Sequence, residues 1–225
     1  MKANNNGLLV NSLTPIRDAV SHLTRLDDFN VVKLSAGFFS EVFKVTHIST
    51  KKVMVLKMNK HPANRSNALR EIELLNKLNH PNVVAFMGTV VHEGQLHPLL
   101  EYLNYGTLEN LIKRFYPVSI TATIPSNEDT SILFSNLAKD VAEGMSYLHN
   151  HNYMHRDLTS RNVLIRRNAD AVKLSSLASL QLTAVIADFG FAIAEPLATD
   201  PKLPIVGSPY WLAPECLKDH WSVSK

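Results

Sequence analysis

The apolar residues of this chain change their spacing about halfway along the sequence, and this change restricts the fold more than any other feature. Between Asp28 and Met58, the segments VVKL (31–34), EVFKVTHI (41–48) and KVMVLKM (52–58) have the apolar–polar alternation typical of β-strands. Segment 131–150 instead carries apolar residues at helical spacing. They are Leu133, Leu137, Val141, Met145 and Leu148. Strands followed by a long helix predict an α+β fold of two lobes.

The segments between these two parts add one helix and two strands. A four-residue apolar stripe predicts a helix that ends at His80-Pro81. The stripe consists of Ala68, Ile72, Leu75 and Leu78. Two short apolar runs, 82–91 and 96–103, are expected to be strands. We therefore expect an N-terminal extension (1–24), a β-rich small lobe (25–103) and a helical lobe (104–225).

Composition excludes several classes of protein. The chain has 225 residues, of which 45% are hydrophobic and 19% charged, as in ordinary globular proteins. The net charge is +3 without a dense basic run, so we expect no nucleic-acid partner. No apolar stretch approaches the roughly 20 residues of a membrane span, so we expect no membrane insertion. The single cysteine, Cys216, and the lack of a signal-peptide pattern favour the cytoplasm, with the nucleus as a second compartment.

Lys57 and Glu71 are charged residues placed among apolar ones. The alternation in 53–58 puts Lys57 on the same strand face as Val53 and Val55, and Glu71 falls inside the apolar stripe of the next helix. Because a buried carboxylate without a cation is costly, we expect Lys57 to pair with Glu71. Taken alone, a lysine whose amine reaches solvent is the commoner explanation of such a residue.

Four short motifs occur in a defined order. Met54-Val55-Leu56-Lys57 ends a predicted strand, and His155-Arg156-Asp157-Leu158 is followed by Asn162. Asp188-Phe189-Gly190 follows the strand-like TAVIA (183–187), and Ala213-Pro214-Glu215 comes last. Each motif is weak alone, but their order and structural context are those of a protein kinase.

From about Leu26 to its end, the chain resembles the eukaryotic protein kinases. Within their tyrosine-kinase-like group it resembles the LIM-kinase and testis-specific-kinase branch most, in GFFSEVFKV (37–45), VMVLKMN (53–59), HRDLTSRN (155–162) and VGSPYWLAPE (206–215). The DLTS and GSPYW stretches are more similar to the testis-specific kinases. The resemblance implies the two-lobed kinase fold. Because the chain ends soon after Glu215, we expect an incomplete helical lobe and a poorly soluble, barely active 225-residue product.

The resemblance also implies a role for particular residues. The catalytic residues would be Lys57, Glu71, Asp157, Asn162 and Asp188. Of these, Asn162 and Asp188 would bind Mg²⁺ or Mn²⁺. ATP would contact Leu34, Ser35, Gly37, Val42, Val55, Lys57, Glu101 and Leu103. Arg156 would pair with a phosphate on the activation segment, where the only hydroxyls between Gly190 and Pro209 belong to Thr199 and Ser208; of the two, Ser208 is the better candidate.

The acceptor is indicated by two positions in the catalytic loop. Serine/threonine kinases usually have a lysine two residues after the catalytic aspartate, but this chain has Thr159. Arg161, four residues after the aspartate, is reminiscent of tyrosine kinases. The resemblance implies dual specificity, with protein substrates of the cofilin (actin-depolymerising) type and a role in regulating the actin cytoskeleton.

Two features depart from the family pattern. Of the glycines in G-x-G-x-x-G, only the middle one, Gly37, is present. The serine at the third position, Ser40, is shared with the resembled branch, so Ser35 is the loss. The long segment between Asn162 and Asp188 contains an apparent insertion at 173–182. We expect weaker nucleotide binding and favour an active kinase. A pseudokinase or scaffold is the first alternative, and an unrelated ATP-binding or metal protein is the second.

The three histidines at positions 149, 151 and 155 are the strongest argument for a metal protein. They have no nearby cysteine and span a predicted helix end, so their rings are not expected to converge on one ion. We therefore expect His155 to be a packed structural residue and the other two to be ordinary helix-end residues.

Overall fold

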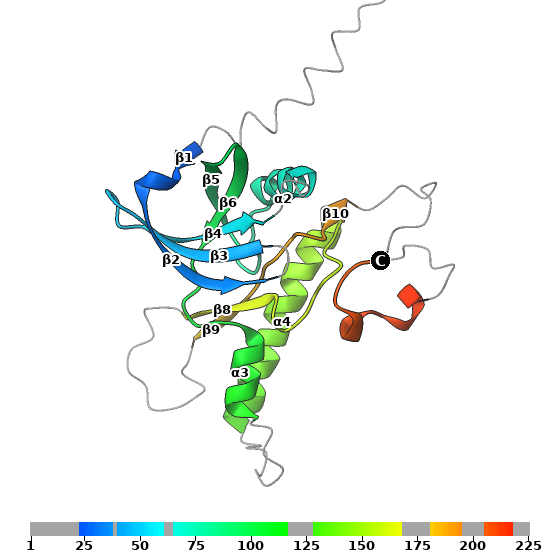
Figure 1. Cartoon of the computed structure of the whole chain (residues 1–225). Helices are drawn as coiled ribbons and strands as arrows, with labels where there is room; N and C mark the ends of the chain where they lie inside the picture. The colour runs from blue at the N-terminus through cyan, green and yellow to red at the C-terminus, as the bar shows by residue number, and fades with distance from the viewer. Residues whose placement is uncertain are drawn as a thin grey trace, which may run out of the picture. The chain divides into compact units, whose positions relative to one another are not determined.

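The computed structural model describes residues 23–37, 40–60, 65–116, 128–167, 181–194 and 205–217. The chain divides into two compact units (Figure 1). The first comprises Met1–Asn79 and Ala85–Tyr102, and the second comprises His80–Val84 and Leu103–Lys225. Each unit is described separately below.

The first unit is built on a six-stranded sheet in the order β1-β5-β6-β4-β3-β2. Its strands are β1 (Leu23–Arg25), β2 (Phe29–Ala36), β3 (Ser40–His47), β4 (Val53–Asn59), β5 (Phe86–His92) and β6 (Gln95–Glu101). β1 runs parallel to β5, and every other neighbouring pair is antiparallel. Helix α2 (Arg65–Lys77) joins β4 to β5. The three strands expected between Asp28 and Met58 are confirmed with small shifts of their ends.

The alternation along β4 separates two faces as expected. Met54 and Leu56 are buried, at 6% and 0% exposure, and join a core that Met58 packs against. The other core residues are Phe29, Val45, Val90 and Leu99. Burying one such aliphatic side chain contributes roughly 1.5–3 kcal/mol, which fixes the register of β4. Lys57 therefore lies on the opposite face of the sheet.

The expected strand 82–91 is only partly correct. β5 begins at Phe86, because residues 82–84 bond to β9 (Leu182–Ile186) of the second unit. The Val84 N–H donates to the Ile186 carbonyl at 2.9 Å, and the Ile186 N–H donates to the Asn82 carbonyl at 2.8 Å. Apolar alternation identifies an extended segment but not the sheet that it joins.

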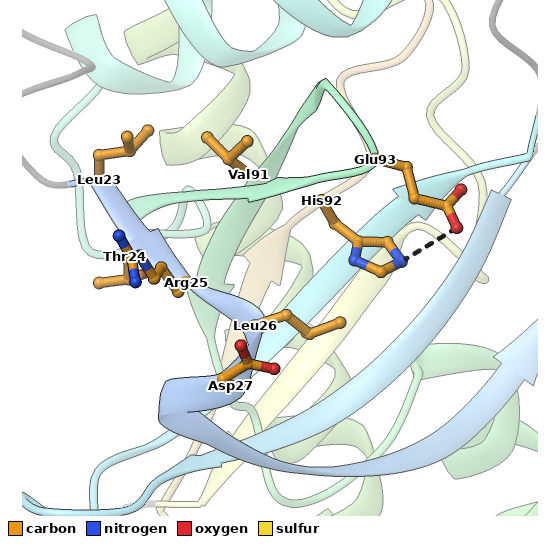
Figure 2. A pocket seen from close by; sticks show the side chains of 8 residues that line it. All are labelled: Leu23, Thr24, Arg25, Leu26, Asp27, Val91, His92 and Glu93. Atoms are coloured by element: carbon orange, nitrogen blue, oxygen red, sulfur yellow. Dashed lines mark ion pairs between the residues drawn. The ribbon is translucent and has the colours of Figure 1, made fainter.

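The boundary expected at residue 24 falls inside β1. Thr24 donates its Oγ1 hydrogen to the Thr89 carbonyl at 3.2 Å, which helps to hold this strand on β5. Residues 1–22 lie outside the described part. Beside β1 is an open hollow of about 570 Å³, and Figure 2 shows the eight side chains that line it. They are Leu23, Thr24, Arg25, Leu26, Asp27, Val91, His92 and Glu93, so the hollow uses none of the residues expected to bind ATP.

In its described residues, the second unit contains two α-helices, two short 3-10 helices (Pro209–Trp211 and Pro214–Leu217) and two small antiparallel sheets. Its elements are α3 (Leu108–Phe115), α4 (Glu128–Asn150), β7 (Tyr153–Met154), β8 (Val163–Arg167), β9 and β10 (Ile193–Ala194). β8 pairs with β9, and β7 pairs with β10. The core cluster consists of Leu111, Leu133, Leu137, Val163, Ile165, Leu182 and Ala184. The predicted apolar stripe of α4 is confirmed, since Leu133, Leu137 and Leu148 are at most 5% exposed.

In the second unit, the short elements α3, β7, β8 and β10 were not expected from the sequence. α3 begins after Thr107, whose side chain accepts a hydrogen bond from the Asn110 N–H at 3.1 Å. The expected strand TAVIA is confirmed as β9. Of the apparent insertion 173–182, only its last two residues are described, and Leu182 begins β9. None of the helices described is both long and apolar enough to cross a membrane.

Candidate active site

Lys57 and Glu71 form a buried ion pair in the first unit. The Lys57 Nζ lies 2.6 Å from the Glu71 Oε1, and the two side chains are 13% and 5% exposed. Lys57 comes from β4 and Glu71 from the second turn of α2. The predicted pairing is confirmed. Each of the two charged groups is paired with the other, as a buried charge requires.

Two of the residues expected to bind ATP share the sheet face of Lys57. Val42 of β3 lies opposite Lys57, and Val55 lies two residues before Lys57 on β4. Both valines are half-buried. Leu34 of β2 is 49% exposed and sits at a register shift between Lys33 and Ser35.

The β2–β3 hairpin carries the remaining glycine of the expected phosphate loop. Ser35 pairs with Val42 in the sheet, and the Gly37 N–H donates to the Ser40 carbonyl at 2.8 Å. Residues 38 and 39 lie outside the described part. The structure therefore gives the two ends of this loop.

Glu101 and Leu103 lie in different units. At the end of β6, the Glu101 N–H donates to the Ala85 carbonyl at 3.0 Å, and the Glu101 Oε1 accepts from the Ala85 N–H at 2.9 Å. Leu103 is 9% exposed and begins the longer stretch of the second unit. Between them, the ring of Tyr102 carries the Lys44 ammonium 4.9 Å from its centroid.

In the second unit, both carboxylate oxygens of Asp157 accept hydrogen bonds. The Asn162 Nδ2 donates to the Asp157 Oδ2 and to the Asp157 carbonyl, both at 2.8 Å. The Ser208 N–H donates to the Asp157 Oδ1, also at 2.8 Å. Three residues singled out from the sequence therefore meet here, and the orientation of the Asp157 carboxylate is fixed.

His155 has a packing role, as expected. It is 2% exposed and lies edge-on to the Phe189 ring with the centroids 5.0 Å apart. The Asp157 N–H approaches its Nδ1 at 3.3 Å, and its Nε2 lies 3.0 Å from the Ala187 carbonyl. A neutral ring with the proton on Nε2 satisfies both contacts. His155 thus links the backbone at Asp157 to the backbone at Ala187, next to Asp188.

His151 has different partners from His155. Its Nδ1 lies 2.8 Å from the Tyr147 carbonyl, and its ring packs on that of Tyr147 at the end of α4. Within the described ranges, no three histidine, cysteine, aspartate or glutamate side chains are grouped so as to hold a metal ion.

Asp188 follows β9 with a left-handed backbone, at φ +62°. Its Oδ1 accepts a hydrogen bond from the Gly190 N–H at 3.3 Å, while Phe189 between them is 2% exposed. The Ala187 N–H donates to the Asn162 carbonyl at 2.8 Å, so the chain segments of Asn162 and Asp188 lie next to each other. Carboxylate and amide oxygens of this kind suit a hard cation such as Mg²⁺.

Arg156 links the catalytic loop to the segment after Asp188. It has φ +64°, and its Nε donates to the Phe191 carbonyl at 2.7 Å. Gly207 lies directly against Arg156, because a Cβ added to Gly207 would be 2.4 Å from the Arg156 carbonyl oxygen. Thr199, the other expected phosphate acceptor, lies outside the described residues.

A charged and aromatic cluster near Asp157 was missed by sequence reasoning. Arg161 bonds through its Nε to the Glu109 Oε1 at 3.3 Å, and its guanidinium lies 6.0 Å from the centre of the Trp211 ring. The hydrogen bond from Lys113, followed by that from Arg161, lowers the pKa of Glu109. Arg161 was noticed only for its motif position, and nothing in the sequence indicates its partners.

Comparisons with known proteins identify what this arrangement is similar to. The family model described as "Protein kinase domain" matches residues 30–225. The "Dual specificity testis-specific protein kinase 1" of Rattus norvegicus is 48% identical over 212 residues, which cover 92% of this chain and 30% of that protein. The "Dual specificity testis-specific protein kinase 2" of Homo sapiens is 46% identical over 203 residues, which cover 89% of this chain and 32% of that protein. The chain thus spans about a third of the length of these relatives.

Proposed function

The chain belongs to the protein kinase domain family, and from this premise we propose that it transfers the γ-phosphate of ATP to hydroxyl groups of proteins. The buried Lys57–Glu71 ion pair carries the proposal. A buried pair of this kind is weak evidence for stability, since desolvation offsets much of its attraction. An ammonium fixed on the face of a sheet is, however, suited to hold a phosphate.

Each residue of the site has a distinct proposed role. Lys57, oriented by Glu71, binds the α- and β-phosphates. Asp157 accepts the proton of the substrate hydroxyl while the oxygen of that hydroxyl forms a bond to the γ-phosphorus. The bond between that phosphorus and the β–γ bridging oxygen breaks, and ADP leaves. Asn162 and Asp188 would hold Mg²⁺ or Mn²⁺, which neutralises phosphate charge when bound.

The adenine and ribose would contact Val42, Val55 and Leu34. The backbone of Glu101 and Leu103 would bond the adenine edge, and Ser35 and Gly37 would lie at the phosphates. Alanine substitutions at the two valines test the contacts with adenine and ribose. Substitutions at Val42 or Val55 should raise the KM for ATP more than they lower kcat.

We propose dual specificity for the acceptor. Both relatives described above are named dual specificity kinases. In this chain Thr159 is buried at 5% exposure, and its Oγ1 accepts from the N–H groups of Arg161 and Asn162 at 3.3 Å. Thr159 therefore shapes the loop rather than providing a cation for the phosphate. We expect transfer mainly to serine and threonine with some tyrosine autophosphorylation. A phosphoamino-acid analysis that found only phosphotyrosine would overturn this proposal.

The proposed substrates are actin-depolymerising proteins of the cofilin type, with the cytoplasm as the main location and the nucleus as a second one. The support is the resemblance to the LIM-kinase and testis-specific-kinase branch. Transfer to purified cofilin, compared with a cofilin whose acceptor serine is alanine, tests the substrate. Imaging of the tagged protein tests the location.

Ser208 is the proposed regulatory site, with Arg156 as the partner of its phosphate. Ser208 is half-buried, and its N–H donates to the carboxylate of Asp157 at 2.8 Å, so a phosphate on the Ser208 side chain would lie next to the catalytic loop. A Ser208→Ala protein should lose most of its activity. Undiminished activity would mean that Ser208 only shapes a turn. Thr199→Ala is the matched control.

A pseudokinase or scaffold is the second candidate, and the depleted glycine loop, with Ser35 in place of its first glycine, favours it. An active kinase and a pseudokinase differ in phosphate transfer but not in nucleotide binding. Mg-ATP should raise the melting temperature under both, whereas only an active kinase moves label from [γ-³²P]ATP to protein.

A further inference from the structure

A lysine outside all the family motifs contacts the phosphate loop. Lys60 follows β4, and its Nζ donates to the Gly37 carbonyl at 2.7 Å. The N–H of the same glycine donates to the Ser40 carbonyl at 2.8 Å. Gly37 is therefore bonded through both its N–H, to Ser40, and its carbonyl, to Lys60.

The shape of the loop at Gly37 does not depend on glycine itself. Gly37 does not have a positive φ, and among the described residues an added Cβ would meet the Ser40 carbonyl oxygen alone, at an ordinary 3.5 Å. On either side, Ser35 pairs with Val42 and Ala36 pairs with Glu41 as regular sheet. The backbone here is held by hydrogen bonds and does not rely on the conformational freedom that three glycines would give.

A second side-chain bond holds the two strands of the hairpin together. The Lys33 Nζ lies 2.6 Å from the Glu41 Oε1, which joins β2 to β3 beside the register shift at Leu34. The hydrogen bond from Lys33 is the main cause that lowers the pKa of Glu41. Lys33 and Lys60 thus bond to the two ends of a loop that kinases use to bind phosphate through backbone N–H groups.

We propose that Lys60 is a positioning residue for the nucleotide, because its bond to the Gly37 carbonyl fixes the backbone at Gly37, where the phosphates would bind. This inference rests on the proposed kinase function. A loop that is held before the ligand arrives loses less conformational freedom on binding, which improves affinity. Lys60 thereby compensates for the glycine that Ser35 replaces.

Lys60→Met removes the donor and keeps the aliphatic stem. Lys52→Met is the matched control, since it removes an exposed lysine at the opposite end of β4. Lys60→Arg restores a donor. In the nucleotide-free protein, residue-resolved hydrogen exchange at the Gly37 amide should be about tenfold faster in Lys60→Met. It should be unchanged in Lys52→Met and close to wild type in Lys60→Arg. The Val45 amide in the middle of β3 should not change in any variant.

Kinetics supply the second readout. Lys60→Met should raise the KM for ATP about fivefold and change kcat by less than about twofold, and adenosine affinity should stay the same. Unchanged exchange at Gly37 in Lys60→Met would overturn the inference, even with a raised KM, because Lys60 would then act directly on the phosphates. Equal effects in Lys52→Met would also overturn it. If no variant, wild type included, transfers phosphate, the proposed function fails while the exchange result still decides the role of Lys60.

Discussion

At the scale of single residues, the site depends on charges that the fold buries and orients. Glu71 is 5% exposed, and Lys57 reaches it from the neighbouring strand. The sequence is sufficient to predict this contact, because a carboxylate inside an apolar stripe requires a cation and Lys57 is the nearest lysine on a matching strand face. The bond from the Ser208 N–H to Asp157 could not be predicted, because a backbone donor leaves no trace in residue type.

The first prediction separates stability from catalysis at the ion pair. Lys57→Met leaves Glu71 buried without its cation, so the free energy of unfolding should fall by about 3 kcal/mol. The double variant Lys57→Met/Glu71→Leu should recover most of this loss, because an apolar pair replaces the ion pair. Both variants should lack phosphotransfer. Urea denaturation and a radiolabel assay measure the two quantities. A double variant that stayed as unstable as Lys57→Met would contradict the account.

The second prediction concerns Gly207, which has φ +107°. A methyl group there would lie 2.4 Å from the Arg156 carbonyl oxygen, so the Ser208 N–H could not stay bonded to Asp157. Gly207→Ala should therefore lower kcat on the order of tenfold or more, with little change in the KM for ATP.

Gly94→Ala is the control for Gly207→Ala. Gly94 also has a positive φ, +68°, but an added Cβ would meet nothing within 4 Å. The Gly94→Ala substitution should lower the free energy of unfolding by about 1 kcal/mol through backbone strain and leave kcat unchanged. Equal kcat values in the two variants would show that the Ser208–Asp157 contact does not matter for turnover.

At the scale of elements, β9 is the structural centre of the second unit. It pairs with β8, and α4 contacts it through the Asp140 Oδ2, which accepts from the Ala184 N–H at 2.8 Å. The Asn82 side chain donates to the Ala184 carbonyl at 2.9 Å. Apolar spacing alone predicts β9 and α4. Apolar spacing does not predict the bond from Asn82 to β9, because this bond joins a polar side chain to a backbone carbonyl far along the chain.

The third prediction tests the packing of α4 against this centre. Alanine normally stabilises a helix relative to glycine by about 1 kcal/mol. At Gly144 the sign should reverse, because an added Cβ would lie 2.8 Å from both the Asn82 carbonyl oxygen and the Ile186 Cδ1. Gly144→Ala should therefore lower the free energy of unfolding by about 1–3 kcal/mol. Ser135→Ala, at an exposed position of the same helix, should be neutral or slightly stabilising. Greater stability of Gly144→Ala in chemical denaturation would show that α4 lies farther from residues 82–84.

At the scale of the whole molecule, the change in apolar spacing corresponds to two units of different composition. The α+β class and the kinase fold expected from the sequence are confirmed by the six-stranded sheet and by the family match over residues 30–225. The strand β1 was missed, because three residues with one partner strand give too short a pattern. α3 was missed for the same reason: its eight residues bury only Leu111. Long periodic segments are predictable from sequence, whereas short ones depend on neighbours far along the chain.

The most direct test of the central claim is phosphate transfer by the protein and by its Asp157→Ala variant, measured in parallel with nucleotide binding. We predict that the wild type, expressed within a complete kinase domain, moves label from [γ-³²P]ATP to a protein substrate in the presence of Mg²⁺. The variant should bind Mg-ATP with similar affinity, since Asp157 acts on the hydroxyl, but its transfer should fall to background. Equal transfer by both proteins would contradict the assignment of Asp157. Binding of Mg-ATP without transfer by the wild type would contradict the claim that the protein is an active kinase.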